Sequence, residues 1–238
     1  MSLPNFMHQQ TAKSHDNYIK NTIIDKNFAR RESFQIEQAC LAHWLPLDSN
    51  EKILELGCGP GKFIPILDAM GFKVVGVDPV EFSSWNSLIS KNITLKSKIF
   101  AECLPFDDHT FDHAVCLGAL LYFNNPEKAL KELNRVIKPG GKVIIRTVNR
   151  MNFYTSFTGK KLDPASKNLY TLPECIELLE TSGFSVKKHF SHGFWPPYFT
   201  NLWWYLISVW LPIPLQRFLS LLTPSSRRIN NILFATRI

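Results

Sequence analysis

The sequence predicts an α/β fold in which a mostly parallel, seven-stranded sheet carries helices on both faces. From Lys52 onward, short β-branched runs alternate with stretches of helical period, a pattern typical of βαβ units. A chain of 238 residues that is 45% hydrophobic can also bury one sizeable core. We therefore expect an N-terminal helical leader over residues 1–50, followed by one α/β domain over residues 51–238.

Seven runs rich in β-branched and apolar residues predict the strands. They lie at 52–56, 73–78, 96–101, 111–117, 142–148, 184–190 and 230–236. Between them, apolar residues recur every three to four positions in stretches whose ends carry capping signals. The first of these helices ends at Gly71, the second opens at Pro126 and stops before Pro139, and the third has Thr171 as its N-cap and ends at Gly183.

The composition limits the partners and the compartment. A formal net charge of +7 fits an anionic partner, either nucleic acid or a lipid surface, but it also fits an ordinary solvated basic surface. The five cysteines are scattered and lack CxxC spacing, so we expect neither a disulfide framework nor a zinc site. We see no secretory signal, and a cytoplasmic location is expected.

A glycine-rich turn follows the first predicted strand. The segment 53–61 reads Ile-Leu-Glu-Leu-Gly-Cys-Gly-Pro-Gly, and such glycines let the backbone turn tightly and approach a ligand. The dinucleotide pattern would need a glycine at Lys62 and the phosphate-loop pattern one at Leu56, so both fail on spacing. Asp78 ends the second strand, 21 residues after Gly57, where a carboxylate can accept hydrogen bonds from both ribose hydroxyls. Together they predict a cofactor site with a ribose.

Four motifs then stand in order along the chain. They are Glu-Leu-Gly-Cys-Gly-Pro-Gly at 55–61, the strand that ends at Asp78, Leu-Pro-Phe-Asp at 104–107 before Phe-Asp at 111–112, and Arg-Val-Ile-Lys-Pro-Gly-Gly at 135–141. This series resembles the class I S-adenosylmethionine (SAM)-dependent methyltransferases, most closely the small-molecule branch called type 11. The resemblance covers about 52–190 and returns at 231–237, which is similar to the family's last, antiparallel strand. It implies a Rossmann-like fold, SAM as cofactor with S-adenosylhomocysteine as product, and no metal.

The resemblance also implies which residues border the cofactor. The methionine end would lie against the residues Glu55, Gly57, Cys58, Gly59 and Gly61, and the ribose against Asp78 and Pro79. The adenine would lie against Ala101, Glu102 and Cys103, and the sulfonium beside Cys116, Leu117 and Gly118. The family often has Asp where this chain has Phe100, and Glu102 is the substitute acceptor for the adenine amino group. Structural roles stay open: Glu55 as an orienter of the loop, Asp78 as a turn residue, Phe100 as core, and Cys58 and Cys116 as small apolar fillers.

Methyl transfer depends more on the alignment of the reacting atoms than on the removal of a proton. Orientation alone can supply about 7–11 kcal/mol, and a general base is required only if the nucleophile keeps its proton. Where the family often has a histidine after the fourth strand, this chain has Tyr122, a poor base that can orient a substrate hydroxyl. The catalytic candidates are therefore Tyr122 and His192, with His15 placed similarly by analogy. Weaker candidates are His109, His113 and His189.

One stretch, the insert at 193–229, departs from the α/β pattern. It holds four of the six tryptophans, and no Asp, Glu, Lys or Arg occurs between Lys188 and Arg217. Its apolar part at 202–211 is shorter than the roughly 20 residues that a membrane-spanning helix needs. We consider three roles for 194–222: a helical cap buried on the domain or in a homodimer, a membrane-interface element, and a lid over an apolar acceptor pocket.

The function expected from these features is methylation of a small, hydrophobic or lipid-like acceptor, on oxygen in preference to carbon or nitrogen. The insert would place the protein in the cytoplasm or at the inner face of a membrane. Two alternatives stay open. An RNA methyltransferase would use the positive charge, although no stripe of basic and aromatic residues favours nucleic acid. A non-catalytic SAM-binding scaffold would explain Tyr122 and Phe100 at places where the family often has polar groups.

Overall fold

The computed structural model describes residues 28–47, 50–88, 90–152, 155–156, 159, 161, 163–193 and 224–238. Over these residues the chain forms one seven-stranded sheet with the order β3-β2-β1-β4-β5-β7-β6. The strands are β1 (Lys52–Leu56), β2 (Lys73–Val77), β3 (Ile93–Lys96), β4 (His113–Leu117), β5 (Lys142–Val148), β6 (Phe184–His192) and β7 (Asn230–Arg237). The strands β1 to β5 pair in parallel, and β7 is antiparallel to both of its neighbours. The predicted fold class is confirmed.

The strand order reverses at the middle of the sheet. β1 pairs with β2 on one side and with β4 on the other, so the connections on its two sides lead in opposite directions. A crevice opens at the carboxyl ends of the strands at such a point, where α/β proteins bind ligands. Because β5 and β6 are both antiparallel to β7, β6 also ends at this carboxyl edge.

The helices follow the predicted boundaries closely. They are α2 (Phe28–Trp44), α3 (Ile64–Ala69), α4 (Pro126–Val136) and α6 (Leu172–Thr181), with 3-10 turns η1 (Ser83–Ser87), η2 (Leu120–Tyr122) and η3 (Ser225–Arg227). Asn125 caps α4 by accepting from the amide of Lys128. Thr171 and Glu174 form a reciprocal capping box at the start of α6, which satisfies two amides that the helix itself cannot.

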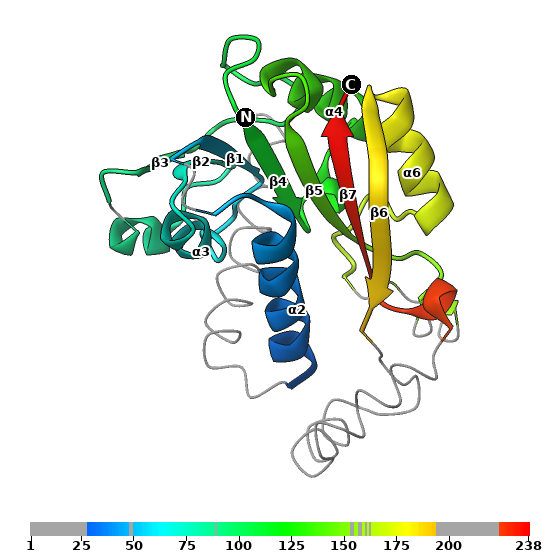
Figure 1. Ribbon diagram of the computed structural model, residues 1–238. Coiled ribbons are helices and arrows are strands. Elements are labelled where there is room, and N and C mark those ends of the chain that lie inside the picture. The colour runs from blue at the N-terminus through cyan, green and yellow to red at the C-terminus, as the bar shows by residue number, and fades with distance from the viewer. Residues whose placement is uncertain are drawn as a thin grey trace, which may run out of the picture.

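Apolar side chains bury both faces of the sheet. One face packs against α4 and α6 through residues such as Leu133 and Leu179. The other packs against α2 and α3 through residues such as Leu41 and Leu67. Figure 1 shows α2 along one face of the sheet and α6 beside β6. The sheet is therefore the middle layer of three.

The structure corrects the third predicted strand. β3 spans Ile93–Lys96, so the expected range of 96–101 is wrong except at Lys96. The alternation of Ile93 and Leu95 with polar residues matches a strand at the edge of the sheet. Beyond Lys96 the chain leaves the sheet, and Ala101 is buried while Phe100 is exposed. The fourth strand begins at His113, two residues later than expected, because Phe111 forms only an isolated bridge with Ile137.

Parts of two other predictions lie outside the described residues. Within the predicted leader at 1–50, α2 is helical and ends before Pro46, and residues 1–27 are not described. Of the insert at 193–229, the structure describes only Gly193 and residues 224–229, which lead through η3 into β7. Among the described helices, none has the length and apolar character to cross a bilayer.

The core position of Leu133 gives a first prediction. Its side chain is 0% exposed, whereas that of Leu47 is 59% exposed. Leu133→Ala should lower the free energy of unfolding by about 2–5 kcal/mol, because it removes packed methyl groups and leaves a cavity. Leu47→Ala should change it by no more than about 0.5 kcal/mol. Denaturant titration followed by circular dichroism measures both, and equal losses would contradict the proposed core.

Candidate active site

The glycine turn after β1 is held against β2. The amides of Gly57 and Cys58 both donate to the carbonyl of Val77, at 2.9 and 3.0 Å. Gly57, Gly59 and Gly61 all have positive φ values, of 71°, 51° and 82°, which glycine adopts without strain. The loop therefore turns back on itself at the carboxyl edge of the sheet.

The three glycines differ in what surrounds them. A Cβ on Gly57 would lie 2.2 Å from the Cβ of Ala119, and one on Gly61 would lie 2.3 Å from the Leu88 side chain. A Cβ on Gly59 would meet no atom within 4 Å. Packing thus requires Gly57 and Gly61 to be small, while Gly59 faces open space that a ligand can occupy.

Asp78 is fixed beside this loop by the backbone. Its Oδ2 accepts from the amide of Gly59 and its Oδ1 from the amide of Val80, both at 2.9 Å. Burial raises the pKa of Asp78 to about 6, and the two backbone hydrogen bonds oppose the shift. Each carboxylate oxygen can still accept from one more donor. Pro79 follows Asp78 and is half-buried.

Glu55 supplies a second carboxyl group near Asp78. Its side chain is 3% exposed, and Oε2 has no hydrogen-bond partner among the described residues. Burial, and then the negative charge of Asp78, raise the pKa of Glu55 well above its usual value. A buried carboxyl oxygen without a partner is costly, so a ligand with an ammonium or N–H group would be stabilised here.

The residues expected around adenine have mixed placements. Ala101 is buried in the turn beyond β3, and Cys103 is exposed. Phe100 is 41% exposed, so the core role that the sequence left open for it is wrong. Glu102 accepts from the amides of Asn124 and Asn125 through Oε1, at 2.8 and 3.0 Å. No sequence pattern indicates this link between Glu102 and the segment before α4, because the residues are more than 20 positions apart.

The residues at the end of β4 are placed at the same edge. Cys116 is fully buried, and burial raises the pKa of its thiol to about 12, so it packs as a neutral group. Burial also raises the pKa of the Cys58 thiol, which fits the filler role for both cysteines. Leu117 ends the strand and is half-buried.

Tyr122 has a carboxylate partner that the sequence did not indicate. Its hydroxyl donates to Oδ2 of Asp163, and Oδ1 of Asp163 accepts from the amide of Ala165 at 2.8 Å. The amides of Lys167 and Asn168 donate to the carbonyl of Leu121, which fastens this segment to η2. The phenol and the carboxylate can therefore share a proton with a bound hydroxyl.

His192 ends β6 at the carboxyl edge and is 5% exposed. Neither ring nitrogen has a hydrogen-bond partner among the described residues. Burial, Arg146 and Arg228 lower the pKa of His192 to about 3, so the ring is neutral and a weak base near neutral pH. A hydrogen-bonding role suits it better than proton abstraction.

The other histidines are not at this edge, or are not described. His113 begins β4 at the opposite end of the strand and bonds Glu51 and the amide of Lys142. His109 contacts Arg237, and His189 is exposed on β6. His15 lies outside the described residues. Of the histidines in the described part of the chain, His192 alone combines the carboxyl edge with burial.

An ion pair that sequence reasoning missed lies close to β4. Arg146 on β5 pairs through Nε with Oε1 of Glu37 on α2, at 3.0 Å. A Cβ on Gly118 would lie 2.9 Å from Nη1 of Arg146, so the guanidinium rests against the first residue after β4. Nothing in the local pattern pairs Glu37 with Arg146, because they are 109 positions apart.

A sheet of this order, with a glycine turn and an acid at the carboxyl ends of its first two strands, defines a Rossmann-like cofactor-binding protein. The family model described as a methyltransferase domain matches residues 54–145. Over this stretch the chain is similar to the class I SAM-dependent methyltransferases. Among the residues that the structure describes, no three His, Cys, Asp or Glu side chains gather as a metal site.

Individual relatives share the domain but differ in acceptor. A sterol 4-C-methyltransferase from Caenorhabditis elegans is 33% identical over 161 residues, which are 59% of this chain and 48% of that protein. A tRNA U34 carboxymethyltransferase from Nautilia profundicola is 33% identical over 105 residues, 42% of this chain and 35% of that protein. The chain spans about half the length or less of these curated relatives.

A solved structure supports the fold. A chain in the complex of the Haloferax volcanii Trm112 methyltransferase activator with a methyltransferase superposes with a TM-score of 0.65. The two chains are 16% identical, and the match covers 95% of each. At this identity the likeness concerns the fold alone.

The open space at Gly59 gives a second prediction. Gly59→Val should abolish SAM binding in isothermal titration calorimetry, because the branched side chain fills that space. The variant should still fold, at a cost of about 1–2 kcal/mol for a positive φ. Gly57→Ala is the contrasting variant, in which the clash with Ala119 should lower the melting temperature more. Normal SAM affinity in Gly59→Val would show that the loop is only a turn.

The position of Asp78 gives a third prediction. Asp78→Ala should weaken SAM binding by about 1.5–3 kcal/mol, the range for hydrogen bonds to a charged group. Ribose hydroxyls stabilise the ionised carboxyl, so SAM affinity of the unmodified protein should fall as the pH falls through about 6. Asp107→Ala, which changes an exposed carboxylate, is the control. Unchanged affinity in a folded Asp78→Ala protein would remove Asp78 from the site.

Proposed function

We propose that the protein transfers a methyl group from SAM to a small, hydrophobic or lipid-like acceptor. The single observation that carries the donor half is the unpartnered Oε2 of Glu55, buried next to the glycine turn and to Asp78. A ligand with one ammonium and two vicinal hydroxyls would satisfy both carboxyl groups. SAM has these groups, so the residues present fit it.

The chain's own residues would divide the binding work. Glu55 would receive the ammonium, Asp78 would accept from the ribose hydroxyls, and Gly59 would leave room for the ligand. When bound, SAM supplies a methyl group on a positively charged sulfur. Ala101 and Glu102 would border the adenine, and Glu102 would use the carboxyl oxygen that does not accept from the amides of Asn124 and Asn125. Cys116 and Leu117 would border the sulfur.

Tyr122 and Asp163 would act on the acceptor. A phenol hydrogen-bonded to a carboxylate can hold a substrate hydroxyl in line and accept its proton through the pair. This arrangement supports oxygen as the methylated atom. Holding the two reactants in line can contribute about 7–11 kcal/mol, which is more than a proton relay usually supplies.

The acceptor class rests on the sterol relative and on an apolar groove described below. The tRNA relative and the net charge of +7 favour an RNA substrate as the second candidate. Membrane contact and homodimer formation through 194–222, and a cytoplasmic location, rest on the sequence alone and remain proposals.

A fourth prediction separates these functions. The protein is incubated with methyl-labelled SAM and, in parallel, with a lipid extract, a polar small-molecule extract and total tRNA. Mass spectrometry should find the label in the lipid extract, and the Gly59→Val protein is the blank. Label in tRNA would establish the RNA function instead. SAM binding without label in any fraction would favour the non-catalytic scaffold.

A further inference from the structure

A positive charge stands where the acceptor would meet the methyl donor. Arg146 lies against Gly118, the first residue beyond β4, with Nη1 and Nη2 at 2.9 and 3.2 Å from the place of a Cβ on that glycine. Oε1 of Glu37 lies 3.0 Å from Nε of Arg146 and forms an ion pair with it, although the two atoms do not meet hydrogen-bond geometry. The Arg146 side chain is 22% exposed, and that of Glu37 is 2% exposed. The pair places the Arg146 charge between α2 and the end of β4.

His192 gives a second, independent sign of a ligand. It is 5% exposed and both ring nitrogens lack a hydrogen-bond partner among the described residues. A buried polar group without a partner is destabilising. Burial, and then the charges of Arg146 and Arg228, lower the pKa of His192 and keep the ring neutral. Arg146 stands in one row of the sheet with Ile232 and Phe190, and His192 follows Phe190 by two residues on the same side of β6. One ring N–H can therefore donate to an oxygen that enters at this side of the sheet.

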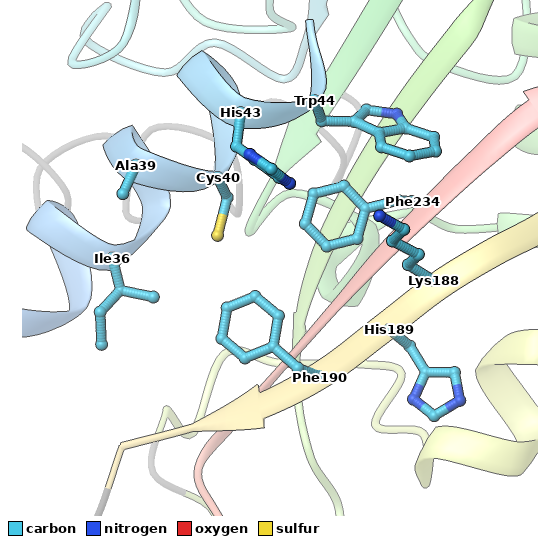
Figure 2. A pocket seen from close by; sticks show the side chains of 9 residues that line it. All are labelled: Ile36, Ala39, Cys40, His43, Trp44, Lys188, His189, Phe190 and Phe234. Atoms are coloured by element: carbon cyan, nitrogen blue, oxygen red, sulfur yellow. The ribbon is translucent and has the colours of Figure 1, made fainter.

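An apolar groove begins next to these polar groups. Its volume is about 400 Å³, and it lies between α2 and the strands β6 and β7. Figure 2 shows the side chains of Phe190 and Phe234 facing Cys40 and Trp44 across it. Phe190 lies 5.7 Å from the His192 ring, measured between ring centroids, and Ile36 at the same end of the groove precedes Glu37.

The groove also has a direction. Phe34 of α2 packs 5.2 Å from Phe63 beside the glycine turn, while the carbonyl of Trp44 accepts from Lys142 at the start of β5. α2 therefore runs from the carboxyl edge of the sheet to its amino edge. Between Ile36 and Trp44 it advances about 12 Å, at about 1.5 Å per residue. The polar end of the groove is the end at the carboxyl edge.

We propose that the acceptor is an amphipathic acid, whose ionised oxygen binds Arg146 and His192 and whose apolar body lies along the Phe190 groove. This inference rests on the methyl transfer proposed above and names its substrate class. The head group is a carboxylate, whose two oxygens match the guanidinium fork, or a phenolate, whose single oxygen can accept from it, and the neutral imidazole adds one donor. The apolar groove wall fits an alkyl chain better than a nucleotide.

An ionised acceptor needs no base, so with such a substrate the Tyr122–Asp163 pair would orient the acceptor and would not take a proton from it. Its oxygen gives an electron pair to the methyl carbon of the sulfonium, and the carbon–sulfur bond breaks with its electrons left on sulfur. The negative charge on oxygen and the positive charge on sulfur disappear together, so no proton has to leave. The product is a neutral ester or ether, which Arg146 holds less tightly than the acid.

Binding in the absence of SAM tests the inference. The probes are decanoate, para-nonylphenol and decanol, each titrated calorimetrically into the full chain below its aggregation limit. Decanoate or ionised nonylphenol should bind about ten- to a hundredfold more tightly than decanol, the range for one hydrogen bond to a charged group. Bound nonylphenol should also show phenolate absorbance at a pH where the free phenol is neutral. Tighter binding of decanoate would identify a carboxylate head group, and tighter binding of ionised nonylphenol a phenolate. Equal affinities for these anions and for decanol would overturn the proposal.

The variants are chosen so that no charge is left buried alone. The double variant Glu37→Gln with Arg146→Gln removes both members of the pair, and it should lose the preference for the anion while binding decanol normally. If that protein does not fold, Arg146→Lys keeps a charge opposite Glu37 without the fork and should lose at least about tenfold in decanoate affinity. Arg150→Gln, in the exposed ion pair with Glu174, is the matched control and should bind as the unmodified protein does. An unchanged anion preference in the folded double variant, or unchanged decanoate affinity in Arg146→Lys, overturns the role of Arg146.

A change in the groove tests the apolar half separately. Each added methylene in a series of carboxylates should raise affinity about three- to fourfold until the groove is full. Ala39→Phe, in the groove wall, should end that increase at a shorter chain. The same increase in both proteins would show that the chain lies elsewhere. If the protein binds SAM but shows no preference for the anion, the acidic acceptor is wrong and the proposed methyl transfer still stands. If it prefers the anion but does not bind SAM, the methyl transfer is wrong and the anion site still stands.

Discussion

The arrangement depends on how the carboxyl ends of β1 and β2 are tied together. One carbonyl, that of Val77, accepts from two successive amides of the glycine turn, and Asp78 then accepts from the amide of Gly59. These three bonds satisfy amides that have no partner within the tight turn itself, and an unsatisfied buried amide is costly. They also set the distance between the open side of Gly59 and the carboxylate of Asp78. A different conformation of the glycine turn would break the bond from Gly59 to Asp78 and would release the Asp78 carboxylate.

The same geometry places two carboxyl groups close together in a buried site. Burial raises the pKa values of Glu55 and Asp78, and the charge of Asp78 adds to the shift at Glu55. Such a site is strained electrostatically until a cation and hydrogen-bond donors enter. Hydrogen-bond donors to the carboxyl groups relieve this electrostatic cost, whereas a larger apolar contact does not. The two carboxyl groups therefore determine which polar groups the ligand must carry.

The sequence predicts those parts of the site that are local in the chain. The glycine turn, Asp78 and the helix boundaries at Pro126 and Thr171 depend on residues a few positions apart, so their patterns are legible. The third strand was predicted too late in the chain because apolar residues occur both in strands and in turns that pack on the core, and the buried Ala101 belongs to such a turn. Partners such as Asp163 for Tyr122, 41 residues away, have no pattern, because only the fold brings them together. Whether the cofactor residues bind SAM remains a prediction, as does catalysis by Tyr122 and His192.

α2 connects the donor side to the acceptor side. Near its start, Phe34 packs on Phe63 and lies under the Lys62 ammonium, 4.0 Å from the ring centroid, next to the glycine turn. One turn later Glu37 pairs with Arg146, and at the far end Trp44 packs on Phe234, 5.3 Å between centroids. Moving the helix away would separate this ion pair and would expose the apolar side chains with which α2 packs on the sheet. The helix therefore behaves as a fixed wall of the groove. Because the same wall supports the glycine turn, a substitution that shifts α2 would disturb the cofactor loop and Arg146 together.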